Sequence, residues 1–441
     1  MQKKLSLLLS TLLLSTPLWA TTLDELVQSG LTNNSLIKKT NLQIELMEAK
    51  KAESQAKKFG EVDIVGSYTH YNLPRTLAPI VPSSLSPTSS VDTTQDLFTT
   101  GIQYSVPLFT GGALEQQVKI DNVVTQMSQS KKRLSKEELI YNIRSLYLSA
   151  LSLQELQISQ ESYVVALEEL KEKIRYGVEL GKHAKIELLK ANNDLTKSIG
   201  DVAKTRSSLT MIKRSLEAVT HYNNIDYLEN LNVELNSNTI SFEESNIAEL
   251  ERFKLQDLEI DKGNKMIKKV ESSFKPQVGL NAYIGYNYDL DRIDPFENEQ
   301  LWQVAVNAKW NIFDFGSTSA RVQQAKIAKL QAITQKEATT EGFKKLFAKA
   351  KSEIETALAN YQTTQSQYEL LQETQNIEQA RYDAGVATLN DLLLAKSKTQ
   401  LAQSQMIQSR YAYQNGIFYL DYLLEQGVDS ISSNVKTKYE N

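Results

Sequence analysis

The chain has 441 residues, of which 49 are basic and 53 are acidic, giving a formal net charge of −4. A charged fraction of 23% beside a hydrophobic fraction of 41% excludes a disordered polyelectrolyte and a polytopic helical membrane protein, and the acidic balance argues against nucleic-acid binding. Cysteine is absent and the three histidines, His70, His183 and His221, are far apart, which disfavours disulfides, thiol chemistry and a histidine-based metal site or catalytic triad.

The first twenty residues are typical of a secretory signal peptide. Two lysines precede an apolar run from Leu5 to Leu14, and Ala20 provides a small residue at the expected cleavage point. The run is too short to cross a bilayer as a helix, and no later apolar run reaches about 18 residues. Residues 1–20 are therefore predicted to be removed. The remainder is expected to be secreted, periplasmic, or inserted in a membrane as β-strands.

The rest of the chain contains two similar blocks, offset by 204 residues. Neither 108–275 nor 296–441 contains proline, as expected of very long helices, because proline disrupts a helix interior. In both blocks apolar residues recur in the alternating four- and three-residue steps of a coiled-coil seam. These residues are Leu139, Ile143, Leu146, Ala150 and Leu153, aligned with Phe343, Phe347, Ala350, Ile354 and Ala357. Because the two seams agree in phase, the chain is interpreted as an internal duplication.

Each half is predicted to contain the same parts in the same order: a helix, a strand hairpin and two helical arms joined at a glycine. In repeat 1 (21–220) these are residues 23–58, 62–109 and 113–220, with the turn near Gly181. In repeat 2 (241–428) they are residues 241–273, 277–313 and 317–428, with the turn near Gly385. An asparagine-rich connector at 221–240 joins the repeats, and 429–441 is predicted to be a disordered tail. The loop within the first hairpin is eleven residues longer than its counterpart, rich in proline, and predicted to be exposed.

The predicted strands alternate between apolar and polar residues, most clearly over 301–313. Trp302 and Trp310 share the apolar face of that segment and are eight residues apart, about 26 Å along a strand. This spacing is close to that of the two aromatic girdles of an outer-membrane barrel. Phe98 begins the apolar face of an earlier strand, so these three aromatic residues are candidates for a membrane girdle. A sheet half-buried against helices in a water-soluble protein explains the alternation equally well.

Four strands are too few to close a barrel in lipid, where every backbone polar group needs a partner. Two copies would supply eight strands, whose side chains nearly fill the interior, whereas three copies would supply twelve and leave a bore. The predicted fold is therefore mixed but mostly α. It comprises a duplicated unit of strand hairpin and long helical hairpin, assembled as a trimeric twelve-stranded transmembrane β-barrel continued by an α-helical coiled-coil periplasmic barrel.

The order of these features, together with Pro-Leu-Phe-Thr-Gly-Gly at 107–112, Arg-Tyr-Asp-Ala-Gly at 381–385 and Asp-Leu-Leu-Leu-Ala at 391–395, resembles the TolC-like outer-membrane efflux and secretion channel family. The resemblance implies a homotrimer in the outer membrane that extends into the periplasm. It implies partners as well: outer-membrane lipid, a periplasmic adaptor (membrane fusion) protein and an inner-membrane RND, ABC or MFS transporter. The implied function is the exit duct of a tripartite efflux pump or type I secretion system, closed at its periplasmic helical tip until engaged.

The resemblance also implies a gate at the turns between paired helices. Asp391 and Glu187 match acidic residues that ring the closed tip, and Tyr382 matches an aromatic residue of the contact that latches the helices. Two positions depart from the family pattern. Ala387 and Leu394 stand where TolC itself has an arginine and a second aspartate, which makes the charge ring thinner and leaves the latch contacts open.

Residues beside the first turn complete the set of gate candidates. Lys182 and His183 are placed where they could replace some of the missing contacts. Gly181 and Gly385 are interpreted as turn formers, because glycine tolerates positive φ after a helix end. For the two acidic candidates a structural explanation stays open, since a carboxylate is favoured in the first turn of a helix by the helix dipole.

No motif in the chain indicates an enzyme. A nucleophile elbow, a phosphate-binding loop and a zinc-binding helix are all missing from the sequence, so no catalytic, cofactor or metal site is predicted. The alternative function is that of a periplasmic adaptor or coiled-coil structural protein of an export complex. An adaptor would carry a single helical hairpin, which the duplication disfavours.

Overall fold

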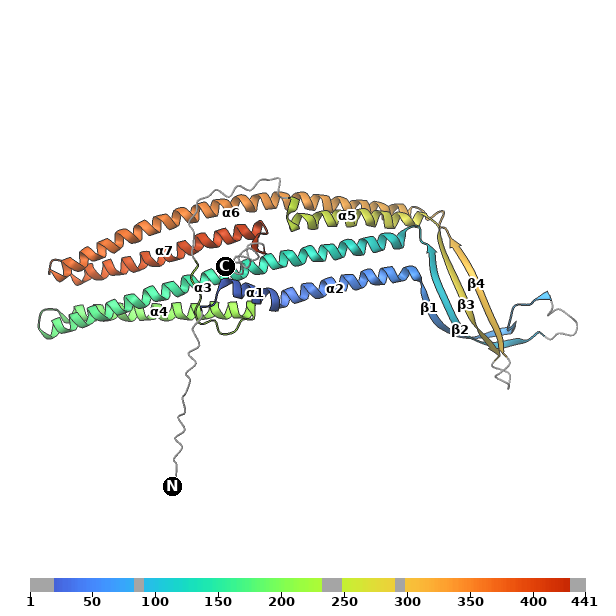
Figure 1. Cartoon of the computed structure of the whole chain (residues 1–441), viewed down its shortest axis with the longest axis horizontal. Helices are drawn as coiled ribbons and strands as arrows, with labels where there is room; N and C mark the ends of the chain where they lie inside the picture. Colours follow the sequence, from blue (N-terminus) through green and yellow to red (C-terminus); the bar gives the residue numbers. More distant parts are fainter. Residues whose placement is uncertain (1–19, 83–90, 232–247, 290–297, 429–441) are drawn as a thin grey trace, which may run out of the picture. The chain divides into compact units, whose positions relative to one another are not determined.

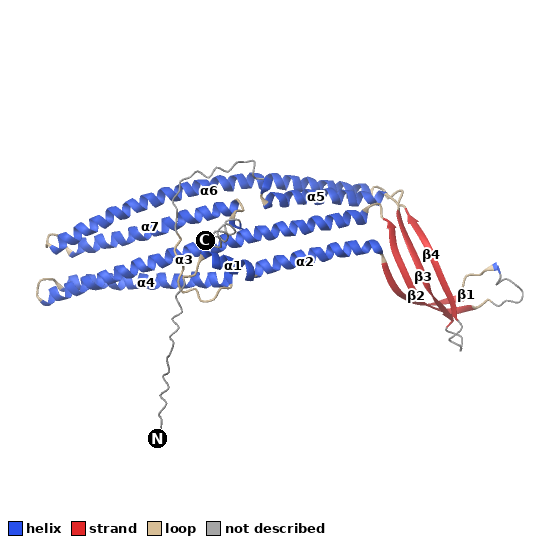
Figure 2. Ribbon diagram, in the orientation of Figure 1, coloured by secondary structure: helices blue, strands red, loops and turns tan. Residues whose placement is uncertain are grey.

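The computed structural model describes residues 20–82, 91–231, 248–289 and 298–428 (Figure 1). They form a mostly helical fold with one antiparallel sheet (Figure 2). Except for Ala20, the predicted signal peptide lies outside the described residues, and so do the predicted tail at 429–441 and residues 232–240 of the predicted connector. Among the described helices, none has a stretch long and apolar enough to cross a membrane.

The chain divides into two compact units, and each unit takes segments from both halves of the sequence. The helical unit comprises 1–38, 134–243 and 343–441, and the sheet unit comprises 39–133 and 244–342. The two predicted repeats therefore do not correspond to the two compact units. Each repeat contributes its strands to the sheet unit and most of its helical arms to the helical unit.

The described helices are α1 (Leu23–Asn33), α2 (Ser35–Ala56), α3 (Ala113–Glu179), α4 (Lys185–Thr220), α5 (Glu251–Glu271), α6 (Ser317–Asp383) and α7 (Leu389–Leu423). α3 and α6 have 67 residues each, and both ends of α6 lie 204 positions after those of α3. α4 and α7 also begin 204 positions apart. The duplication inferred from the seam residues is thus present in the lengths of the elements themselves.

The helix expected over 23–58 is interrupted at Asn34. The backbone of Asn34 is extended, with φ −61° and ψ 133°. Its side-chain amide donates to the carbonyl of Val219 at 2.7 Å, while its side-chain oxygen accepts from the amide of Leu36 at 2.8 Å. A side chain that satisfies backbone groups in this way competes with helix continuation, so α1 and α2 are separate helices. In the second repeat α5 begins at Glu251, and residues 241–247 of the helix expected from 241 lie outside the described residues.

The core of the helical unit is built by α1, α3, α4 and α7. Ile143, Tyr147 and Leu216 are completely buried in it. The seam residues predicted in the first half belong to this core: Leu139 and Ala150 are buried and Leu146 packs against them. Burial of apolar side chains along one helical stripe is what holds long helices side by side, because propensity alone does not.

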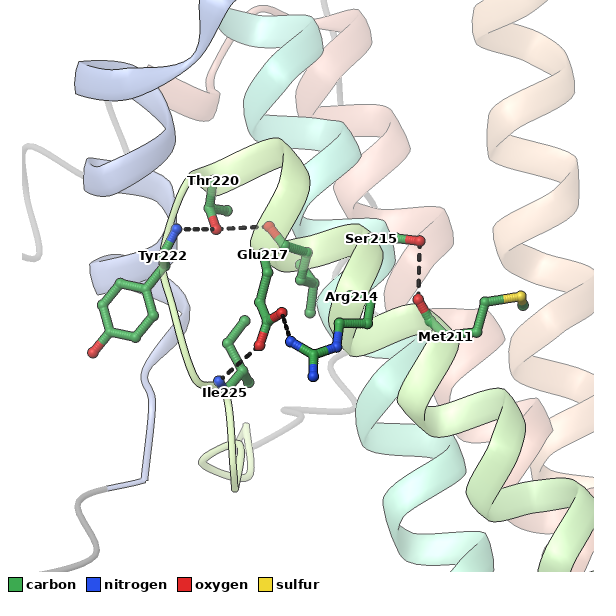
Figure 3. Close-up of polar contacts among 8 residues, drawn as sticks. Met211, Arg214, Ser215, Glu217, Thr220, Tyr222 and Ile225 are labelled. Atoms are coloured by element: carbon green, nitrogen blue, oxygen red, sulfur yellow. Dashed lines mark hydrogen bonds and ion pairs between the residues drawn. The ribbon is translucent and has the colours of Figure 1, made fainter.

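The end of α4 is fixed by its own side chains (Figure 3). The hydroxyl of Thr220 donates to the carbonyl of Leu216 at 2.6 Å and accepts from the amide of Tyr222 at 3.2 Å. Glu217 accepts from Arg214 at 2.7 Å and from the amide of Ile225 at 3.2 Å. These bonds direct the first residues of the connector back along the helical unit.

The sheet unit contains β1 (Glu61–Thr76), β2 (Thr93–Phe109), β3 (Gln277–Asp289) and β4 (Asn298–Lys309), in the spatial order β1-β2-β3-β4 with every neighbouring pair antiparallel. β4 ends before Trp310, although the sequence predicts a strand to residue 313. The last pair of the ladder is Gln277 with Lys309, and beyond it the indole N–H of Trp310 donates to the carbonyl of Phe274 at 2.9 Å.

The pairing register resolves the two faces of β1, which the sequence leaves ambiguous. Val62 pairs with Tyr104 and Ile64 with Ile102, so both belong to the apolar face. Asp63 pairs with Gln103 and belongs to the polar face. Because side chains alternate along a strand, one fixed pair assigns the face of every other residue.

Candidate functional site

The two turns predicted from glycine are both present at one end of the helical hairpins. Gly181 and Gly385 have φ of +71° and +75°, in the left-handed region that favours glycine. The amide of Gly181 donates to Val178 at 3.0 Å, and the amide of Gly385 donates to Tyr382 at 2.9 Å. Bonds of this kind satisfy the last carbonyls of a helix and end it cleanly.

His183 links the two hairpins at this tip. Its Nδ1 lies 2.7 Å from Oε2 of Glu187, on the first turn of α4. Its ring stacks on that of Tyr382 near the end of α6, with centroids 6.3 Å apart and an interplanar angle of 19°. A Cβ at position 177 would collide with the imidazole, so Gly177 leaves the room that the His183 ring occupies. The structure thus brings together three of the gate candidates, which we call the tip cluster.

Tyr382 is half-buried against the apolar residues that hold the hairpins together. Leu170 and Leu195 come from α3 and α4, and Leu392 comes from α7. Burial raises the pKa of the Tyr382 phenol, and the negative charge of Glu187 raises it further. The phenol is therefore protonated at neutral pH.

Asp391 and Lys182 lie outside the tip cluster. Asp391 forms a capping box at the start of α7: its Oδ2 accepts from the amide of Thr388 at 3.0 Å and from the hydroxyl of Thr388 at 2.6 Å. These bonds hold the pKa of the Asp391 carboxyl below its usual value. Lys182 is exposed. The sequence reasoning missed Thr388, although a threonine three residues before an acidic side chain is a recognisable helix-start pattern.

The structure locates both positions that depart from the family pattern. Leu394 is 51% exposed and, with Ile186 and Leu189 of α4, lines an open groove of about 460 Å³ between α4 and α7. Ala387 lies in the turn after Gly385, where its amide donates to Arg381 at 3.2 Å. The groove was not predicted, because it is formed by residues from both hairpins.

The apolar face of the sheet is exposed along its whole width. One row of paired residues crosses it from β1 to β4: Ile64, Ile102, Ile284 and Trp302. Their exposed fractions are 87%, 50%, 49% and 71%. A water-soluble sheet packed on helices would bury these side chains, so the unit presents a large apolar surface that needs an apolar environment.

An aromatic row and then a hydrogen-bonded polar pair follow toward the loop end of the same face. Phe98 pairs with Tyr68 on one side and Tyr288 on the other, and the rings of Phe98 and Tyr288 are 6.1 Å apart. Beyond them, Nδ1 of His70 lies 2.8 Å from Oδ1 of Asp96. Trp302 belongs to the apolar row described above, which lies farther from the loop end than the aromatic row that contains Phe98. An order of apolar, aromatic and polar rows is typical of a surface that passes from hydrocarbon into a headgroup region.

The opposite face is polar. Asp63, Gln103, Tyr283 and Gln303 form one row across the four strands. The hydroxyl of Tyr283 donates to the carbonyl of Thr100 at 3.2 Å. The amide of Gln103 donates to Ser105, on the same face, at 3.1 Å. One face of the sheet thus suits hydrocarbon and the other suits water.

The fold is similar to those of solved membrane proteins, channels among them. The Campylobacter jejuni CmeC outer membrane channel is 18% identical, with a TM-score of 0.76 over 94% of this chain and 88% of that chain. CusC, in structures concerned with folding and transmembrane channel formation, is 17% identical, with a TM-score of 0.76 over 91% of each chain. A membrane protein from Pseudomonas aeruginosa is 16% identical, with a TM-score of 0.77 over 92% of this chain and 91% of that chain.

The sequence itself assigns the family. The chain belongs to the outer membrane efflux protein family, whose profile matches residues 26–220 and 248–421. No curated protein sequence matches the chain. The resemblance to TolC-like channels and the mostly helical fold class, both predicted from the sequence, are confirmed.

Proposed function

We propose that this protein is the outer-membrane exit duct of a tripartite efflux pump and that three copies build it. The observation that carries the proposal is the incomplete sheet. Within the described residues β1 pairs only with β2, and β4 pairs only with β3. Each outer edge leaves a row of backbone N–H and C=O groups without a strand partner, which lipid does not tolerate.

Joining β4 of one copy to β1 of the next satisfies both edges. Three copies give a closed sheet of twelve strands, with the Ile102 face toward lipid and the Gln103 face toward the bore. Two copies would give eight strands, whose inward side chains fill the interior. The polar face supports three copies, because a row of amide and carboxylate side chains needs a water-filled bore.

The helical hairpins supply the periplasmic part of the proposed duct. The tip cluster of His183, Glu187 and Tyr382 ties one hairpin to the other and supports a closed resting tip. Asp391 adds a carboxylate at the same end. A periplasmic adaptor protein would open this end, and the groove lined by Leu394 is the surface that we assign to it. An inner-membrane transporter of the RND, ABC or MFS class would supply the cargo.

Native mass spectrometry of detergent-purified protein tests the assembly. The expected result is a single species with three times the mass of the mature chain. A monomer, or a dimer that persists on dilution, would contradict the proposal. Membrane fractionation separates it from the adaptor alternative, because a channel should pellet with outer membranes and resist extraction by salt and carbonate.

A further inference from the structure

The hairpin of β1 and β2 bends sharply near its loop end. His70 pairs with Asp96, but the next pair is Arg75 with Thr94. Four residues of β1, 71–74, therefore lie opposite a single residue of β2. A bulge of this kind bends and twists a strand pair, and Figure 1 shows β1 and β2 turning away from the direction of β3 and β4 at this point.

The ladder resumes beyond the bend. Thr76 pairs with Thr93, and the amide of Leu77 donates to the carbonyl of Asp92 at 3.1 Å. We call the two short segments 75–77 and 92–94 the strap. Because its two segments are hydrogen-bonded to each other, the strap is an ordered ribbon.

The strap lies against β3, which is not a neighbour of β1 in the sheet. The side-chain amide of Asn287 donates to the carbonyl of Leu77 at 2.6 Å, and the hydroxyl of Thr94 donates to Oδ1 of Asp289 at 2.5 Å. To make the first of these bonds, a residue that follows β1 must cross over β2. Asn287 pairs with Thr99 and also accepts a bond from its hydroxyl at 3.1 Å, which places it on the polar face.

Burial shows that this contact is packed. Leu77 and Thr94 are 3% exposed, and Asn287 and Asp289 are 8% exposed. Buried polar side chains are stable only with hydrogen-bond partners, and the bonds across the contact supply them. The Thr94 hydroxyl also accepts from the amide of Asp96 at 2.9 Å, which ties the contact to the bend.

We infer that the strap narrows the outer mouth of the duct and sets the size of solute that passes it. The inference rests on the proposed function, in which the polar face lines the bore. A ribbon folded over that face at the loop end takes up bore cross-section, and three copies would bring three straps to one opening. The longer loop that the sequence shows in the first repeat provides the residues for the strap.

Engineered disulfides test where the strap lies, and the absence of native cysteine makes the experiment clean. The test variant is Thr94→Cys with Asp289→Cys. The matched control is Thr94→Cys with Tyr288→Cys, because Tyr288 is the neighbouring residue of β3 and belongs to the opposite face. Under oxidising conditions the expected result is an intramolecular disulfide in the first variant and none in the control. The reverse pattern, or no disulfide in either variant, would refute the placement.

Polymer exclusion in planar bilayers tests the narrowing. Polyethylene glycols of increasing size are added to the sheet side, and the largest one that lowers single-channel conductance is recorded. Reducing the disulfide of the test variant should shift this limit to larger polymers, and Thr94→Val should give the same shift without any cysteine. The control pair should not respond to reductant. An unchanged limit in both variants would refute a narrowing role.

The trimer proposal and the strap proposal can be refuted independently of each other. The disulfide forms within one chain, so it is expected even in a monomer. A monomer in native mass spectrometry therefore contradicts the trimer, whereas a correct trimer without the disulfide contradicts the strap.

Discussion

One imidazole ring at the helical tip contacts residues from two helices that are about 200 positions apart in sequence. His183 bonds to Glu187 within its own hairpin and stacks on Tyr382 of the other. The family resemblance made Glu187 and Tyr382 gate candidates, and the place of His183 beside the first turn added the third. The sequence did not predict that they meet, because helical periodicity assigns a face within one helix and carries no information on which distant helix packs against it.

Asp391 illustrates how a local bond sets the charge of a gate candidate. Thr388 holds the Asp391 carboxylate through two hydrogen bonds and lowers its pKa from the ordinary value of 3.8. Because the folded-state pKa is lowered, the bonds favour the folded tip above pH 3.8, and this contribution is lost as the pH falls through the lower value. The Asp391 carboxylate is therefore charged at neutral and mildly acidic pH.

Replacing Asp391 by asparagine should weaken the block of single-channel current by multivalent cations. We expect the blocking concentration to rise by on the order of tenfold, because in the proposed trimer three carboxylates at a narrow opening would concentrate cations. In the unmodified protein the block should persist at mildly acidic pH and fade only below the ordinary carboxyl pKa of 3.8. Planar-bilayer recordings over a pH series measure both effects.

Asp383→Asn is the matched control for this prediction. Asp383 ends α6 at the same tip, where its carboxylate accepts from Gln379 at 3.2 Å. Equal loss of block in the two variants would show that general charge at the tip is responsible, and no loss in Asp391→Asn would remove Asp391 from the gate.

At the scale of elements the duplication governs the architecture. α3 and α6 have equal lengths and end at equivalent glycine turns, although their sequences differ at most positions. The two halves share the phase of their apolar seam residues and the glycines at their turns. Both features were predicted from the sequence. The break at Asn34 and the bulge at 71–74 were not readable, because each depends on bonds to groups distant in sequence or in a neighbouring strand.

Gly385→Ala should destabilise the turn between α6 and α7. An added Cβ would meet no atom within 4 Å, so space is not limiting. The cost comes from the positive φ, which is about 1–2 kcal/mol for a residue with a Cβ. Hydrogen exchange should therefore accelerate at Val386, whose amide donates to Arg381 at 2.9 Å across the turn.

Gly200→Ala serves as the opposite control. Gly200 lies inside α4, and a Cβ there would also meet nothing within 4 Å. Since its backbone is helical, alanine should stabilise α4 by about 0.5–1 kcal/mol and slow exchange nearby. Faster hydrogen exchange in both variants would show that the positive φ of Gly385 is not the cause of the faster exchange in Gly385→Ala.

At the scale of the whole molecule, the apolar face and the polar face of the sheet determine the surroundings that the protein needs. The alternation was predicted from the sequence for three of the strands, and the register supplies the fourth. Trp302 and Trp310 were predicted as the two edges of a membrane band, but Trp310 follows the end of β4 and Phe98 stands in a further aromatic row. Strand ends depend on where backbone pairing with the neighbouring strand stops, here at Gln277 with Lys309, and alternation does not encode that position.

Ile102→Lys should prevent stable insertion into the outer membrane. Ile102 is 50% exposed on the apolar face, and a lysine near the middle of a bilayer costs about 2–4 kcal/mol in a transmembrane strand. Three copies would multiply this cost. The measurement is the fraction of protein that resists carbonate extraction, which should fall sharply.

Gln103→Lys is the adjacent comparison, since residue 103 belongs to the polar face of the same strand. This variant should insert normally and change only the ion selectivity of the bore. If Gln103→Lys failed to insert while Ile102→Lys succeeded, the assignment of the two faces would be reversed.

The unpaired edges of β1 and β4 also have a genetic consequence. If each wall is shared among three polypeptides, one subunit with a damaged edge breaks the junction at that edge and leaves the ring open. In a cell that makes intact and edge-disrupted polypeptides in equal amounts, only about one assembly in eight would contain three intact subunits. An allele that damages one edge should therefore be dominant over the wild type, whereas an allele that abolishes expression should be recessive.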